Sequence, residues 1–317
     1  MATVLEDVAA QQPLAVREGP GLIATGDFDG DQREDLVLFG WSGRSGTYLA
    51  DPIAPGFRHR GGGPGVYSFD LTDTPLYVGG YLYVPIRLGQ GGYCELRVFA
   101  YAASAWTLRR SIVIAPSTPS VSVSSFKLCP YHADVDGDKQ PDVLAVWGET
   151  PIGPTGAFRA AVLSPTGPLS IAAIPRVTGQ TTDSAVVDVH RAKPMVVTKQ
   201  PEYLVTLSAA STDPGGGFGF VTLGQGLAVG AGVWASGGPA LNHAAYFGAT
   251  SPVAYGDFRV LPTMKTPLVQ VTSGRSVLFK PWVSAPYVAN NAEILLSSSR
   301  SLLLDTCVAD FDGDGRD

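Results

Sequence analysis

The sequence predicts an all-β fold made of repeated units, each built from several short strands. Glycine and proline contribute 38 and 25 of the 317 residues and are spread along the chain, which favours strands joined by turns over long helices. Hydrophobic residues make up 45% of the chain, enough for a sizeable buried core. Length alone allows two average domains or one large barrel or propeller. The period of an internal repeat distinguishes between these possibilities.

An acidic stretch is the first element of that repeat and sets its period. It begins at Asp27, returns at Asp134 and appears in shortened form at Asp310. The first two copies are 107 residues apart, close to twice 53, and weaker strand–turn–strand patterns lie between and after them. Periods of about 40–50 residues with several strands per repeat are typical of β-propellers. The prediction is one propeller over residues 1–317, with blade loops near 27, 80, 134, 188, 257 and 310.

Each acidic stretch places carboxylates at alternate positions of a tight turn. In a count of nine positions, carboxylates fall at one, three, five and nine, and a glycine at position four permits the sharp turn. Converging carboxylates carry about four negative charges and suit Ca²⁺, which takes roughly 6–8 oxygens, better than Mg²⁺. Position seven varies in side chain and is expected to bind through its backbone carbonyl. The candidate ligands are Asp27, Asp29, Asp31, Arg33 and Asp35 in the first stretch, Asp134, Asp136, Asp138, Gln140 and Asp142 in the second, and Asp310, Asp312 and Asp314 in the third.

Two other structures, a plain polar turn and an EF-hand, also use acidic residues and glycine at close spacing. A plain polar turn also favours Asp and Gly, but its recurrence at the same spacing favours the metal loop. An EF-hand places glycine at position six and glutamate at position twelve before a helix, whereas here the runs LVLF and VLAVW predict strands. The loop should therefore connect two strands. The third copy ends at Asp317, one residue short of position nine, so we expect it to bind weakly or not at all.

The strand–DxDGDxxxD–strand unit resembles the FG-GAP repeat of integrin α-subunit propellers and its bacterial relatives, the VCBS repeats. The motif covers only a small part of the chain directly, and the rest of the resemblance depends on the period. It implies four-stranded antiparallel blades with calcium loops between neighbouring strands, and six or seven blades in a complete propeller. The weaker copies keep at most one of these carboxylates each, such as Asp188, so no ligands are assigned to them. Because the chain ends inside its sixth repeat, truncation at the C-terminus is one interpretation.

Aromatic and sulfur-containing side chains are expected to serve the core. Trp41 and Trp147 follow the first two acidic stretches at the same offset, which favours core packing over a ligand platform. The three cysteines have no CxxC spacing, so neither a disulfide framework nor a zinc site is predicted. Cys94 and Cys129 could be bridged or could remain buried free thiols. The third cysteine is Cys307.

No catalytic constellation is visible in the sequence. It contains no GxSxG, no HExxH and no close carboxylate pair outside the acidic stretches. The four histidines are widely separated, and none has a neighbouring nucleophile or orienting carboxylate. We therefore expect a protein that is not an enzyme.

Charge and hydropathy limit the partners and the location. A net charge of −6 and the lack of a Lys/Arg cluster argue against a nucleic-acid partner. The uncharged stretch 214–256 is broken by glycine-rich runs and never holds twenty strongly apolar residues, so no membrane span is predicted. No signal peptide is visible at the start of the chain.

The expected function is a calcium-stabilised, non-catalytic module for binding, adhesion or scaffolding, located outside the cell or on its surface. Large propeller faces built from loops suit recognition of a protein or carbohydrate ligand. The integrin-like relatives add to this expectation by analogy only. The alternatives are a propeller segment of a large secreted bacterial protein of the Rhs or toxin-complex type, and an accessory module of a hydrolase or lyase.

Overall fold

The computed structural model describes residues 22–40, 45–53, 56–66, 71–87, 92–150, 158–175, 184–192, 202–209, 217–236, 253–256, 266–271, 275–279 and 292–297. Within these ranges every regular element is a strand, apart from one short 3-10 turn, η2 (Gln225–Leu227). The all-β prediction is confirmed. None of the described segments forms a helix long and apolar enough to cross a membrane.

The described strands form five four-stranded antiparallel sheets, each made of four consecutive strands. The first sheet contains β1 (Leu22–Gly26), β2 (Asp35–Phe39), β3 (Ser45–Ala50) and β4 (Phe57–Gly62). The second contains β5 (Leu76–Val78), β6 (Tyr81–Arg87), β7 (Cys94–Ala102) and β8 (Ala105–Ile114). The third contains β9 (Ser122–Pro130), β10 (Val143–Thr150), β11 (Phe158–Ser164) and β12 (Gly167–Ile174).

The remaining two sheets repeat this plan. The fourth contains β13 (Ser184–Ala192), β14 (Glu202–Ala209), β15 (Gly217–Leu223) and β16 (Val229–Ser236). The fifth contains β17 (Val253–Gly256), β18 (Thr266–Val271), β19 (Arg275–Phe279) and β20 (Ala292–Ser297). In all five sheets the strands pair in chain order, which confirms the predicted four-stranded antiparallel units.

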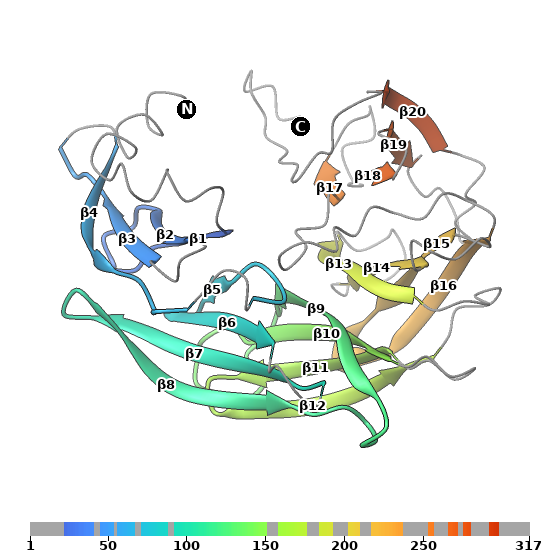
Figure 1. Ribbon diagram of the computed structural model, residues 1–317, viewed down its shortest axis with the longest axis horizontal. Coiled ribbons are helices and arrows are strands. Elements are labelled where there is room, and N and C mark those ends of the chain that lie inside the picture. Colours follow the sequence, from blue (N-terminus) through green and yellow to red (C-terminus); the bar gives the residue numbers. More distant parts are fainter. Residues whose placement is uncertain are drawn as a thin grey trace.

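The five sheets follow one another around an arc, with the first and last sheets at its two ends (Figure 1). The first strands of successive sheets contact each other: β1 contacts β5, β5 contacts β9, β9 contacts β13, and β13 contacts β17. These first strands line the inside of the arc, and the fourth strands lie on its outside (Figure 1). Sheets arranged radially in this way are the blades of a β-propeller.

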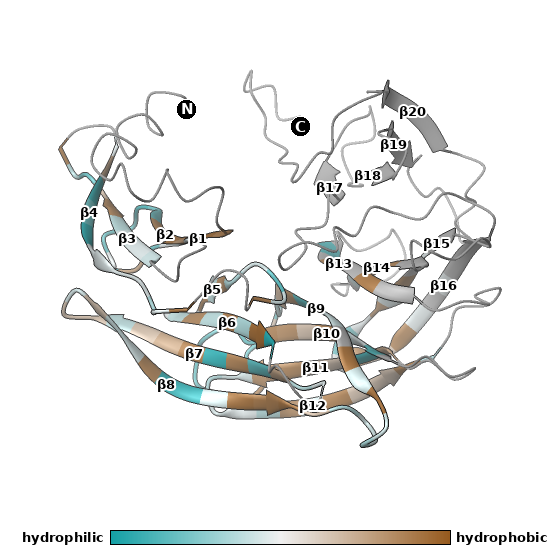
Figure 2. Cartoon of the chain, viewed as in Figure 1, coloured by the Kyte–Doolittle hydropathy of each residue, from teal (hydrophilic) through white to brown (hydrophobic). Residues whose placement is uncertain are grey.

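The hydrophobic core is divided into layers between neighbouring sheets. Side chains along a strand point alternately to its two faces, and both faces of β10 are covered. Val143, Ala145 and Trp147 belong to the layer shared with the second sheet, whereas Leu144 and Val146 belong to the layer shared with the fourth. None of the five is more than 2% exposed. The apolar run VLAVW is therefore a strand buried on both faces, largely brown in Figure 2.

The predicted loops near residues 80 and 257 coincide with the ends of strands, whereas the one near 188 does not. Near residue 80, β5 and β6 are joined by the Gly79–Gly80 turn, as the sequence predicts. The predicted loop near 257 begins where β17 ends. Asp188, however, lies inside β13, so the turn predicted near 188 does not lie at that residue. The alternating run around Asp188 continues the strand, and a register shift beside it accommodates the irregularity.

Three of the residues that the sequence places in the core lie within the described ranges. Trp147 is buried, as expected. Cys94 and Cys129 are both buried but belong to different core layers, so they do not form with each other the bridge that the sequence left open. Burial raises the pKa of the Cys94 thiol to about 12. Trp41, Cys307 and the third acidic stretch lie outside the described residues.

Candidate metal centres

The first acidic loop joins β1 to β2 at the end of an inner strand. Gly30 at position four and Gln32 at position six have positive φ angles of 83° and 68°, which close the turn. The two oxygens of Asp27 accept hydrogen bonds from the backbone N–H groups of these residues, at 2.7 and 2.8 Å. The carboxylate at position one therefore shapes the loop that carries the other acidic residues.

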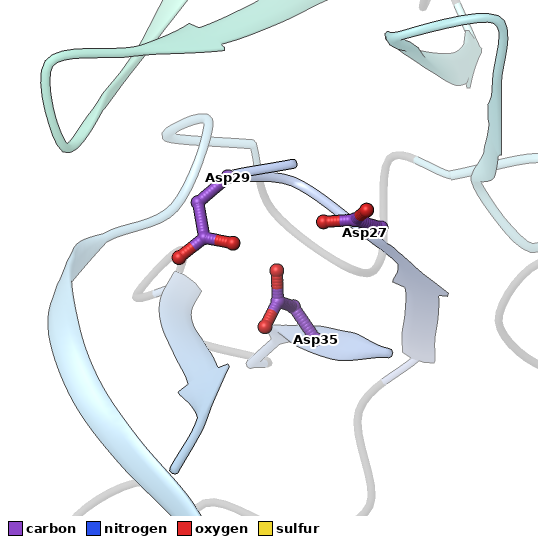
Figure 3. Close-up of side chains that lie close together, drawn as sticks. All are labelled: Asp27, Asp29 and Asp35. Atoms are coloured by element: carbon purple, nitrogen blue, oxygen red, sulfur yellow. The ribbon is translucent and has the colours of Figure 1, made fainter. Parts of the chain in front are cut away.

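Three of the four candidate ligand carboxylates in this loop converge. Asp27, Asp29 and Asp35 each offer an oxygen within 4.8 Å of the others, and Figure 3 shows their carboxylates directed toward a common space. Asp31 is not in this group, and its Oδ1 accepts the backbone N–H of Arg33 at 2.9 Å. The Arg33 guanidinium donates to the backbone oxygen of Asp51 at 2.6 Å. At position seven the backbone carbonyl is therefore the group that remains for a cation.

Asp35, at position nine, anchors the loop to the first sheet. Its side chain is buried, its Oδ2 accepts the backbone N–H of Phe28 at 2.8 Å, and its Oδ1 accepts that of Ala50 at 2.8 Å. Burial raises the pKa of Asp35, and these two hydrogen bonds oppose the rise. Asp35 thus holds the loop and the end of β3 together.

The second acidic loop joins β9 to β10 and has the same backbone geometry. Gly137 and Lys139, at positions four and six, have φ angles of 82° and 70°. Asp134 accepts their backbone N–H groups at 2.6 Å each, as Asp27 does in the first loop. The side chains at positions six to eight differ completely between the loops. The shared acidic and glycine positions therefore determine the turn.

The carboxylates of the second loop converge in a different combination. Asp134, Asp136 and Asp138 form the close group, and Asp142 at position nine is not part of it. Asp142 is 1% exposed; its Oδ2 accepts the backbone N–H of Val135 at 2.7 Å, but its Oδ1 is buried without a hydrogen-bond partner. Burial, with the charges of the other three carboxylates adding to it, raises the pKa of Asp142 to about 6.

A divalent cation fits these two loops. Their ligand atoms are hard oxygens, which Ca²⁺ prefers. A buried polar atom left without a partner costs about 1–3 kcal/mol, and a cation beside the Asp142 carboxylate would remove much of that cost. The hydrogen bonds within the loops leave capacity for an ion, because a carboxylate has about four lone-pair sites. A plain polar turn explains those hydrogen bonds but neither the convergence nor the unpartnered oxygen.

Asp142 is expected to make the cation-free protein more stable as the pH falls from 7 to 5. Its pKa is about 6 in the folded protein, above the ordinary 3.8, so the folded state binds the proton more readily and gains stability as the group protonates. Melting temperatures at pH 7 and pH 5 in EDTA, for the native chain and Asp142→Asn, measure this contribution. The native chain should gain more, or lose less, on acidification. An identical pH response in the two proteins would contradict the expectation.

Position two distinguishes the two loops. Val135 in the second loop is 51% exposed, whereas Phe28 in the first is 6% exposed. The Phe28 ring packs edge-on against Tyr77 of β5, at 4.8 Å between centroids, and against Trp106 of β8, at 5.0 Å. The first loop is therefore fastened to the second sheet by an aromatic cluster, a role that the sequence analysis did not assign to Phe28.

Beside the second loop, Tyr203 of β14 links the third and fourth sheets. Its hydroxyl accepts the backbone N–H of His132 at 2.7 Å, and donates to the backbone oxygen of Pro130 at 3.3 Å. The ring stacks on Tyr131, with centroids 5.7 Å apart. Burial, with the charge of Arg191, lowers the pKa of His132. These contacts give His132 a structural role at the base of the loop.

A buried ion pair between the second and third sheets was also missed by the sequence analysis. Lys127 of β9 places its Nζ 2.9 Å from Oδ1 of Asp73, and the backbone N–H of Leu128 donates to Oδ2 at 2.9 Å. Both charged residues are 6% exposed. Burial raises the pKa of Asp73, and the charge of Lys127 opposes the rise. Two single charges so far apart in the chain give no sequence signal.

No family model and no curated protein matches the sequence. Among solved structures, the chain is similar to an α-L-arabinanase of Penicillium chrysogenum, at 11% identity and a TM-score of 0.47, over 81% of this chain and 76% of that chain. It is also similar to the GH93 α-L-arabinofuranosidase of Fusarium graminearum, at 7% identity and 0.48, over 81% and 76%. Saccharomyces cerevisiae Sqt1 gives 9% identity and 0.42, over 89% and 64%. At these identities and with TM-scores below 0.5, no property of these proteins is assigned to the chain.

Proposed function

We propose that the chain is a calcium-stabilised, non-catalytic propeller of the FG-GAP/VCBS kind that serves as a binding, adhesion or scaffolding module. One observation carries the proposal: two acidic loops of the same backbone geometry each gather three carboxylates within 4.8 Å. Repetition of this geometry between the first and second strands of two sheets favours a structural ion over a chance polar turn.

The proposed role of the ion is to hold the inner strands of the propeller. The first loop follows β1 and the second follows β9, and both strands line the inside of the arc. Position-nine carboxylates are buried beside the loops, so an ion at the loop would join exposed and buried groups. Such an ion stabilises the fold, and no reaction is assigned to it.

The proposed setting is extracellular or on the cell surface, and the proposed ligand is a protein or a carbohydrate. Weak oxygen-ligand sites of extracellular modules bind Ca²⁺ with dissociation constants of about 10⁻⁴–10⁻³ M, which suits calcium levels outside the cell. Loops gathered at one edge of a rigid scaffold are common recognition surfaces. The loop carboxylates would be ion ligands here, which is why we assign them no catalytic task.

Asp29→Ala and Asp136→Ala are each expected to remove one bound Ca²⁺. Each substitution deletes a converging carboxylate, and the damage should remain local because a blade contacts mainly its neighbours. Isothermal titration calorimetry with CaCl₂ counts the ions. Glu34→Ala is the matched control, because Glu34 is an exposed acidic residue of the first loop outside the converging group.

The control variant should bind as many ions as the native chain. If Asp29→Ala or Asp136→Ala also binds the native number, the ligand assignment at that loop is wrong. If the native chain binds no Ca²⁺ at millimolar concentration, the proposed function fails as a whole.

A further inference from the structure

The Gly79–Gly80 turn between β5 and β6 takes the place of an acidic loop in the second sheet but holds no carboxylate. On one side it continues from Tyr77, whose ring packs against Phe28 of the first metal loop. The approach is close, since a Cβ at Gly26, the residue before that loop, would lie 2.1 Å from Cδ1 of Tyr77. Tyr77 of β5 therefore contacts Phe28 of the first loop and lies against Gly26, the last residue of β1.

The other side of the same turn contacts the second metal loop. Gly79 has a φ of +59°, and a Cβ there would lie 3.0 Å from Cβ of Gln140 and 3.2 Å from the backbone oxygen of Pro141. These are positions seven and eight of the second loop. In addition, Tyr83 of β6 packs in the same core layer as Val143, the residue that follows the loop. The turn thus lies directly against the second loop.

We propose that the β5–β6 turn couples the two metal loops, so that Ca²⁺ bound at one loop increases the affinity of the other. This inference rests on the proposed function and adds regulation to the same two sites. The path is short: Phe28 contacts Tyr77, and Tyr77 is two residues from Gly79, which contacts Gln140 and Pro141. The second sheet, whose β5–β6 turn holds no carboxylate, acts as the connection.

Positive coupling follows from what each ion must order. An ion at the first loop fixes the loop backbone, and with it Phe28 against Tyr77. That contact holds β5 and its turn, which is the surface against which Gln140 and Pro141 pack. Once the turn is held, the second ion has less to order, and its binding is correspondingly favoured. Because coupling is reciprocal, the second ion must strengthen the first by the same factor.

Calorimetric titration with CaCl₂ tests the coupling. All variants carry Asp312→Ala, so that the third acidic stretch makes no contribution. Asp136→Ala and Asp29→Ala give the binding constants of the first and second loops alone. The overall constant for two ions is expected to exceed their product by at least about fivefold. In Tyr77→Leu, which keeps an apolar side chain but removes the ring, the ratio should fall to about one, whereas Tyr77→Phe should keep it.

Phe28→Val provides a second, independent disruption, because valine is the residue that the second loop carries at this position. It should abolish the coupling as well while the affinity of the second loop alone stays unchanged. An overall constant equal to the product of the single-loop constants would overturn the coupling and leave the two calcium sites intact. A ratio above five that survives both Tyr77→Leu and Phe28→Val would overturn the path through the turn. Failure of either loop to bind Ca²⁺ would instead sink the proposed function.

Discussion

Transfer of the protein from excess EDTA into Ca²⁺ at about a hundredfold excess over the dissociation constants of the two loops is expected to raise the free energy of unfolding by about 5 kcal/mol. Each ion that binds only the folded state adds RT ln(1 + [L]/Kd), which is about 2.7 kcal/mol at a hundredfold excess over Kd. Carboxylates converge in two loops, so the stabilising contributions of two bound ions are expected. Differential scanning calorimetry, or urea unfolding at both conditions, measures the change.

Two controls distinguish specific binding from general screening of an acidic protein. Mg²⁺ at the same concentration and ionic strength should stabilise less, because it prefers octahedral geometry and keeps its water. The double variant Asp29→Ala/Asp136→Ala should lose most of the response to Ca²⁺. An unchanged melting temperature between EDTA and Ca²⁺ would show that the loops are polar turns and no more.

Lys127→Met is expected to destabilise the fold by about 3–5 kcal/mol, because it leaves the Asp73 carboxylate buried without its charged partner. Methionine fills similar space, so the loss reports the ion pair more than a cavity. Urea unfolding followed by tryptophan fluorescence gives the difference in free energy. The loss should be smaller at low pH, since burial raises the pKa of Asp73 and its protonated form needs no counter-charge.

The double variant Asp73→Asn/Lys127→Met is the matched control. The asparagine oxygen can still accept the backbone N–H of Leu128, and the buried charge of Asp73 is removed. This double variant should therefore be more stable than Lys127→Met alone. If the single and double variants are equally destabilised, the ion pair is not what holds the second and third sheets at this point.

Much of the fold could be predicted because its signals are local. The strands on either side of the acidic loops, the buried face of Trp147 and the glycine turn near residue 80 follow from composition and alternation within a few residues. Asp188 was misplaced for the same reason: one acidic residue in an alternating run suggested a degenerate loop, although alternation itself indicates a strand. At this position the acidic residue indicated a loop and the alternating pattern indicated a strand. The period of the repeat favoured the loop, which was wrong.

The candidate site was predicted only in part, because convergence is a property of three-dimensional geometry. The spacing gives four equivalent carboxylates, but the structure gathers Asp27, Asp29 and Asp35 in one loop and omits Asp142 from the other group. Contacts between sheets could not be predicted from the sequence either, because Phe28 packs against its aromatic partners across the interface between two blades. The one sequence feature that pointed to a role for Phe28 was the recurrence of phenylalanine at position two in the third copy of the loop.

The pairing of each sheet from four consecutive strands has a consequence for how the chain folds as it leaves the ribosome. Among the described strands, every pairing within a sheet joins neighbours in sequence, and such local topologies form quickly compared with those that need distant segments. A sheet can therefore pair as soon as its fourth strand has emerged. Its apolar faces, however, stay open until the following sheet has been made, and Asp73 cannot pair with Lys127 until four further strands, β5 to β8, have been synthesised. During synthesis the most recently formed sheet therefore exposes one apolar face, and this face is the surface to which a chaperone would bind.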